Sequence, residues 1–171
     1  MKKHFTLVLC ISTASLLFGQ KHSLKFDFIT GIHKPTGSLD IENKWGWRLG
    51  GGLRYSFKNK SSLNIVQLSY DKFAKSDVRD NIDQKENAKL SNTLSLLTGY
   101  SYPVFNKVYI GGNVGVGFVG HNRIDRVTKL GINPLISFEP FREVYVDFGY
   151  LNFWGGNRNT SYLNFNLRYS F

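Results

Sequence analysis

The sequence has little cysteine, methionine, proline or extended apolar chain. It contains one cysteine, one methionine and four prolines in 171 residues. Cys10 lies inside the leader segment described below, so no disulfide or thiol chemistry is expected in the rest of the chain. A lipid-modified Cys10 would need a small residue before it, whereas Leu9 occupies that place. The mean hydropathy is −0.24 and the only long apolar stretch is N-terminal, which excludes a bundle of membrane-spanning helices.

Acidic residues are also scarce. The chain has 12 Asp and Glu residues and 22 Lys and Arg residues, which gives a formal net charge of +10. Aromatic residues make up 15% of the chain and 17 residues are glycine, a composition that excludes a disordered polycation. No basic helix or arginine-rich run is present, so nucleic acid is not expected as a partner.

Residues 1–19 have the organisation of a cleaved secretory signal peptide. A basic start is followed by an apolar and small-residue stretch over residues 5–18, and Gly19 supplies a small residue before Gln20. A membrane-anchoring helix is the alternative, but this stretch is short for a span and is interrupted by hydroxyl residues. The sequence therefore predicts cleavage between Gly19 and Gln20 and a single mature domain over residues 20–171.

Eight segments of the predicted mature chain alternate between apolar and polar residues at period two, which indicates β-strands. A change of phase between Ile65 and Val66 predicts a bulge in the third segment, and Pro134 is expected to interrupt the sixth. Tight turns alternate with longer polar connections, as in an up-and-down meander. The segments are 24–32, 45–57, 63–73, 89–102, 108–120, 127–138, 143–154 and 161–171.

The two faces of these segments differ in composition. In the second, fourth, fifth and eighth segments the polar face is rich in glycine, serine and threonine and has no lysine or glutamate. A lipocalin-like soluble barrel would show water a more charged face, whereas small residues suit the interior of a narrow barrel. The apolar face then faces lipid. Aromatic residues gather near the tight turns (Tyr55, Phe57, Tyr100, Tyr102, Phe138, Tyr169, Phe171) and near the long connections (Trp45, Trp47, Phe73, Trp154).

These features predict an all-β fold, an eight-stranded antiparallel up-and-down transmembrane β-barrel. Four charged residues point inward by parity and lie at similar heights: Asp27, Arg54, Asp147 and Arg168. We expect them to form an interior polar network across the seam between the first and last strands. An ion or proton pathway is the alternative, but alternating unlike charges tend to plug a lumen. Three further charged residues are expected at the margin of the network: Lys25, Arg48 and Glu143.

The chain resembles the small eight-stranded outer-membrane β-barrel proteins of the OmpA/OmpX type. The resemblance rests on the signal peptide, the eight alternating segments and the terminal segment over residues 162–171. It implies an integral outer-membrane location among outer-membrane lipids, with periplasmic chaperones and the barrel-assembly machinery as partners during biogenesis. It also implies that the terminal segment is the assembly signal, with these apolar positions: Leu163, Phe165, Leu167, Tyr169 and Phe171.

Family roles range over adhesion, surface protection and anchoring, so the resemblance implies a non-enzymatic structural or surface-interaction role. The surface connections over residues 33–44 and 74–88 would carry it. A small-solute transport barrel and a lipid A-modifying enzyme are the alternatives. An enzyme of the latter kind needs a histidine and a serine on one outward strand, and His22, His33 and His121 lack such a serine. We therefore expect no catalytic residue, no cofactor and no metal site.

Overall fold

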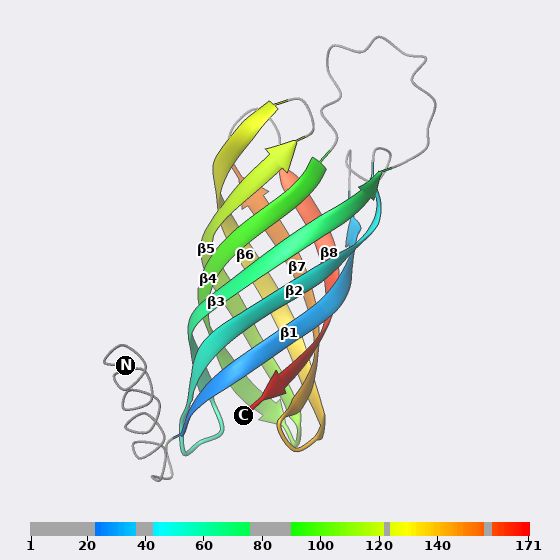
Figure 1. The fold of residues 1–171 in the computed structure, drawn as a ribbon. Coiled ribbons are helices and arrows are strands. Elements are labelled where there is room, and N and C mark those ends of the chain that lie inside the picture. The colour runs from blue at the N-terminus through cyan, green and yellow to red at the C-terminus, as the bar shows by residue number, and fades with distance from the viewer. Residues whose placement is uncertain (1–22, 37–42, 76–89, 122–123, 156–158) are drawn as a thin grey trace, which may run out of the picture.

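Eight antiparallel strands close into a barrel in the computed structural model (Figure 1). The structure describes residues 23–36, 43–75, 90–121, 124–155 and 159–171. Each strand pairs with its neighbours in chain order, and the first also pairs with the last, so the predicted fold class is confirmed. The strands are β1 (Ser23–Pro35), β2 (Asn43–Ser56), β3 (Ser62–Lys75), β4 (Leu90–Phe105), β5 (Val108–His121), β6 (Ile124–Phe141), β7 (Val144–Trp154) and β8 (Thr160–Ser170).

Several predictions fall outside the described residues. The signal peptide and its cleavage site between Gly19 and Gln20 lie there, as do most of the two long connections over residues 33–44 and 74–88. In the described ranges no helix is long and apolar enough to cross a membrane.

The two ends of the barrel differ. The turns at residues 57–61, 106–107 and 142–143 lie at one end together with the C-terminus, and we call this the turn end (Figure 1). The long connections join the strands at the opposite end, which we call the loop end. Each tight turn contains one non-glycine residue with a positive φ of 65° or 66°: Lys60, Lys107 and Glu143.

The predicted bulge in β3 is confirmed. Its register with β2 and β4 shifts around Ile65 and Val66, and both of these side chains face outward. Because one extra residue reverses the alternation, Phe73 points into the barrel and is only 4% exposed. The expectation that Phe73 belongs to the outer aromatic band is therefore wrong.

Pro134 does not interrupt the sixth strand. β6 continues through it, and Pro134 lies opposite Gly112 of β5. The pairing of β6 with β7 lapses between Ile132 and Leu135, where a residue without an N–H donor is tolerated.

The strand faces divide between a wall and a filled interior. Large apolar side chains such as Phe28, Leu68, Ile136 and Phe148 face outward and are 47% to 56% exposed. Glycines on the inner face leave room for larger neighbours. A Cβ atom on Gly149, for example, would lie 2.6 Å from Oδ1 of Asn133, too close for either to stay in place. The small inner residues therefore permit side chains to meet across a narrow lumen.

Candidate functional site

The interior of the barrel is the candidate site, because polar and charged side chains are buried there. In the turn half, Arg168 binds Asp147 through two hydrogen bonds of 2.9 Å, from Nε and Nη2. Asp27 Oδ2 lies 3.1 Å from Nε of Arg54 and 3.4 Å from Nη1 of Arg168. The structure thus brings together the four charged residues singled out from the sequence. Two cations and two carboxylates meet, so the cluster has no net formal charge.

Tyr145 completes this cluster and was missed by sequence reasoning. The guanidinium groups of Arg54 and Arg168 each lie 4.5 Å from the centre of its ring, a cation–π geometry. Ser170 adds hydrogen bonds to Asp27 and Arg54. Tyr145 lies two positions before Asp147 on the same strand face, so parity alone could have found it.

The three residues expected at the margin of the network, Lys25, Arg48 and Glu143, do not all lie in one place. Lys25 and Glu143 pair at the turn end, with 3.1 Å between Nζ and Oε1. Arg48 does not join them, because it lies in the loop half of the lumen. That expectation is wrong for Arg48, because its place along β2, well removed from Arg54, sets it opposite Asp71 of β3.

Side-chain amides occupy the middle of the lumen. Asn164 donates to Asn133 at 3.1 Å, and Asn166 donates to Asn164 at 2.9 Å. On the opposite wall Asn64 donates to Asn113 at 3.2 Å and to Gln67 at 3.1 Å. Since amides carry both donors and acceptors, they fill the lumen with hydrogen bonds and without adding charge.

A second ionic cluster lies in the loop half. Arg48 binds Asp71 with distances of 2.6 Å from Nε and 3.0 Å from Nη2, and the Tyr162 hydroxyl donates to Asp71 at 2.6 Å. His33 Nδ1 lies 3.6 Å from Asp71, and its ring packs 4.3 Å from that of Phe73.

Sequence reasoning placed His33 at the start of a connection, but β1 continues to Pro35 and buries this side chain to 1% exposure. His33 and Asp27 are separated by an even number of positions on β1, so the alternation of the strand could have predicted that both side chains point inward.

An apolar cluster fills the lumen beside these charges. Its members are buried to between 0% and 4% exposure: Phe73, Leu97, Val119, Leu151, Phe153 and Tyr162. The ring of Phe153 lies against Gly117 and Gly131, whose missing side chains make room for it. The predicted interior polar network did not include this apolar cluster, although Leu151 and Phe153 share the inward parity of Asp147.

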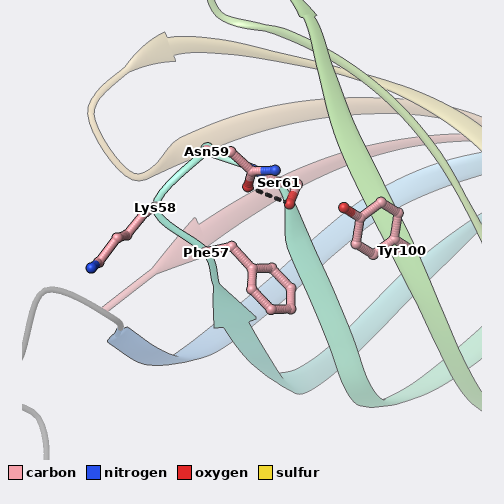
Figure 2. A pocket seen from close by; sticks show the side chains of 5 residues that line it. All are labelled: Phe57, Lys58, Asn59, Ser61 and Tyr100. Atoms are coloured by element: carbon pink, nitrogen blue, oxygen red, sulfur yellow. Dashed lines mark hydrogen bonds between the residues drawn. The ribbon is translucent and has the colours of Figure 1, made fainter.

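A small depression of about 340 Å³ lies on the outside of the β2–β3 turn (Figure 2). Asn59 Oδ1 accepts hydrogen bonds from the backbone N–H and the hydroxyl of Ser61, at 3.1 and 2.6 Å, and so fixes the turn. The rings of Phe57 and Tyr100 form its wall, and the side chain of Lys58 points away from it in Figure 2. This depression holds no pairing of a base with a nucleophile. Within the described ranges, no group of three or more histidine, cysteine, aspartate or glutamate side chains could hold a metal ion.

The residues of the proposed assembly signal all face outward on the last strand or follow it: Leu163, Phe165, Leu167, Tyr169 and Phe171. The backbone N–H and carbonyl of Phe171 each form a 3.0 Å hydrogen bond with Phe26 of β1. The terminal residue therefore contributes to the seam.

A closed antiparallel barrel with an apolar wall and a polar, filled interior defines the fold of the small eight-stranded outer-membrane β-barrels, and the resemblance to the OmpA/OmpX type is confirmed at this level. Neither a protein-family model nor a curated protein sequence matches the chain.

Among solved structures, the chain is similar to the Yersinia pestis outer membrane protein Ail in a bilayer nanodisc, at 16% identity over 87% of this chain and 100% of that one, with a TM-score of 0.56. Neisserial surface protein A matches at 13% identity over 89% and 100% of the two chains, with a TM-score of 0.52. A de novo designed transmembrane β-barrel matches at 14% identity over 89% and 98%, with a TM-score of 0.53.

Proposed function

We propose that this chain is an integral outer-membrane protein, a closed and non-enzymatic barrel that acts at the cell surface through its loop end. The observation that carries the proposal is the outer wall, where large apolar side chains of all eight strands are exposed. Soluble monomers rarely expose contiguous apolar patches larger than a few hundred Å². In a bilayer the same apolar wall contacts lipid chains instead of water, and the closed sheet leaves no unpaired strand edge.

The orientation follows from the two ends. Outer-membrane barrels place short turns in the periplasm and longer loops outside. The loop end therefore faces the surroundings of the cell, and the predicted signal peptide supplies the export route. The names of two similar structures support a surface role. Ail is the attachment invasion locus protein, and the second structure is Neisserial surface protein A. Adhesion or surface protection is the function we assign.

The filled lumen supports a barrel that does not conduct. One neutral ion cluster and an amide layer occupy the turn half and the middle, and the Arg48–Asp71 pair and the apolar cluster around Phe153 occupy the loop half. Steady passage of small solutes would require these side chains to move aside.

Membrane fractionation and planar-bilayer recording test this function. The protein should fractionate with the outer membrane, fold in detergent with a β-type circular dichroism spectrum and show a heat-modifiable gel band, and add no steady conductance to a bilayer. Deletion of residues 76–89 should abolish surface contact and leave the barrel folded. A steady conductance would instead indicate transport, and altered lipid A in a deletion strain would indicate an enzyme.

A further inference from the structure

The mouth of the barrel at the turn end contains a hollow of about 470 Å³. It lies between the three tight turns and the first buried ion pairs of the lumen. Its lining contains five cationic side chains and two carboxylates, and because Asp27 already neutralises Arg54, two positive charges remain in excess. The cations are Lys25, Arg54, Lys60, Lys107 and Arg142, and the carboxylates are Glu139 and Glu143.

Both carboxylates already have hydrogen-bond partners within the lining of the hollow. Glu143 accepts from Lys25 at 3.1 Å. Glu139 accepts from the hydroxyl of Tyr109 at 2.9 Å and from the backbone N–H of Glu143 at 3.1 Å. In the described part of the chain, no carboxylate forms a salt bridge with Lys60 or Lys107. Among the described residues, the Lys107 ammonium donates to a neutral carbonyl, that of Pro140, at 3.4 Å, and neither lysine has an anionic partner.

The backbone at these two lysines is unusual. Lys60 and Lys107 both have a φ of 65°, in the left-handed region that glycine adopts with less strain. Glu143 occupies the corresponding place in the third turn and holds Lys25. Each tight turn thus places a charged side chain at the mouth from a strained position. Strain of this kind often marks a functional constraint.

The floor of the hollow is closely packed. Arg54 lies over the ring of Tyr145 at 4.5 Å, and Tyr145 packs against Tyr109 at 5.9 Å between ring centres. Arg54 is also held by Asp27 at 3.1 Å. A ligand would therefore meet a fixed guanidinium below and two lysine ammonium groups at the rim.

We propose that this hollow binds a small anion that carries several phosphate groups. Uncompensated ammonium groups form charge-assisted hydrogen bonds with phosphate oxygens, and a guanidinium adds a donor of fixed geometry. The volume lies within the range of small-ligand pockets. The site lies at the opposite end from the surface loops, so it does not depend on the external role proposed above. The phosphates can come from a soluble compound or from the headgroup of a lipid beside the barrel mouth.

Titration with inorganic tripolyphosphate tests the site, using the full mature barrel folded in zwitterionic detergent at about 0.15 M salt, where long-range attraction is screened. The rim variant is Lys60→Gln with Lys107→Gln. The matched control is Lys34→Gln with Lys72→Gln, which removes two exposed lysines from the outer wall towards the loop end. We expect one saturable site per barrel in the wild type, binding at least about tenfold weaker in the rim variant, and a change within about twofold in the control.

A second variant separates charge from backbone strain. Lys60→Gly with Lys107→Gly should fold at least as well as the wild type, because glycine suits a positive φ, and should still lose tripolyphosphate binding. Absence of saturable binding by the wild-type barrel would overturn the proposal. Equal weakening in the rim and control variants would overturn it as well, since that result describes non-specific attraction.

Nanodiscs identify the source of the phosphate. The wild type and the control variant are compared in discs of zwitterionic lipid alone and in discs that contain phosphatidylglycerol. Weaker tripolyphosphate binding in the phosphatidylglycerol discs, for the wild type and the control variant alike, would assign the site to a lipid headgroup. Unchanged tripolyphosphate binding in both kinds of disc would assign it to a soluble phosphate compound, and no binding in either disc would refute the site.

Discussion

The hydroxyl of Thr98 donates a hydrogen bond of 2.9 Å to the backbone carbonyl of Asn64 on the outer wall of the barrel. The bond lies at the bulge formed by Ile65 and Val66, where the pairing of β3 with β4 skips from Asn64 to Gln67 and the regular ladder is interrupted. A carbonyl without a partner in hydrocarbon is costly, since no water is present to replace the missing donor. Thr98 thus lets the barrel keep its bulge within the apolar wall.

Replacing Thr98 with valine should therefore destabilise the barrel in lipid. We expect Thr98→Val to lower the free energy of unfolding by about 1–3 kcal/mol, the range for leaving one polar group unsatisfied. Urea unfolding in lipid vesicles measures the change. Thr98→Ser should retain most of the stability. Thr128→Val is the matched control, because Thr128 is also exposed and no hydrogen bond of its side chain is found in the described structure; equal losses at both positions would contradict the role of Thr98.

Arg168 and Asp147 should behave as a coupled pair. Arg168→Gln leaves Asp147 buried without its two 2.9 Å bonds, and we expect a loss of roughly 3–5 kcal/mol, as for other broken buried pairs. The double variant with Asp147→Asn should be less destabilised than the sum of the single changes. A double-mutant cycle measures this coupling, and strict additivity would show that the two residues act independently.

Gly117 should tolerate no side chain while Phe153 is present. A Cβ atom there would lie 2.8 Å from Cδ1 of the Phe153 ring, so Gly117→Ala should destabilise the barrel by about 1–3 kcal/mol through overpacking. Adding Phe153→Leu should recover part of the loss. Gly112 on the same strand is the control, because its Cβ would meet no atom closer than 3.7 Å. Thermal unfolding in detergent distinguishes the three variants.

Deletion of Phe171 should lower assembly more than stability. Two backbone hydrogen bonds to Phe26 are lost, which corresponds to about 1–3 kcal/mol. This loss is smaller than the free energy of unfolding of a typical folded protein. If the assembly machinery recognises Phe171, loss of this residue should reduce the amount of folded barrel in the membrane several-fold. Phe171→Trp keeps an aromatic side chain and serves as the control. Quantitative blotting of membrane fractions gives the yield, and equal yields of the wild type and the deletion would refute the recognition role.

Period-two alternation was sufficient to predict all eight strands and the inward direction of Asp27, Arg54, Asp147 and Arg168, because the side-chain period of a strand is fixed by its backbone. Their proximity also followed from sequence, since closing the barrel makes the first and last strands neighbours. His33 was missed because the first strand continues past the point where its alternation weakens. Phe73 was assigned to the wrong face although the bulge that reverses it had been predicted.

Apart from the four charged residues at the seam, the contacts between side chains across the lumen did not follow from the sequence. Arg48 and Arg54 share one face of β2, yet they belong to different ionic clusters. Which residues of opposite walls meet depends on strand tilt and stagger, and these are properties of the whole sheet. The hollow at the turn end depends on the same property, because its cations come from separate turns that only the closed barrel brings together.

The seam between β1 and β8 is held by an ion pair as well as by backbone pairing. Asp27 and Arg168 are separated by 141 positions in the chain and meet only when the last strand reaches the first. A sheet of eight strands that has not closed leaves Asp27 with half of its cationic partners and exposes two unpaired edges. The step that seals the edges is therefore also the step that joins the Asp27–Arg54 pair to the Asp147–Arg168 pair. A sheet that has not closed is therefore destabilised twice, by its unpaired edges and by the missing contact between Asp27 and Arg168.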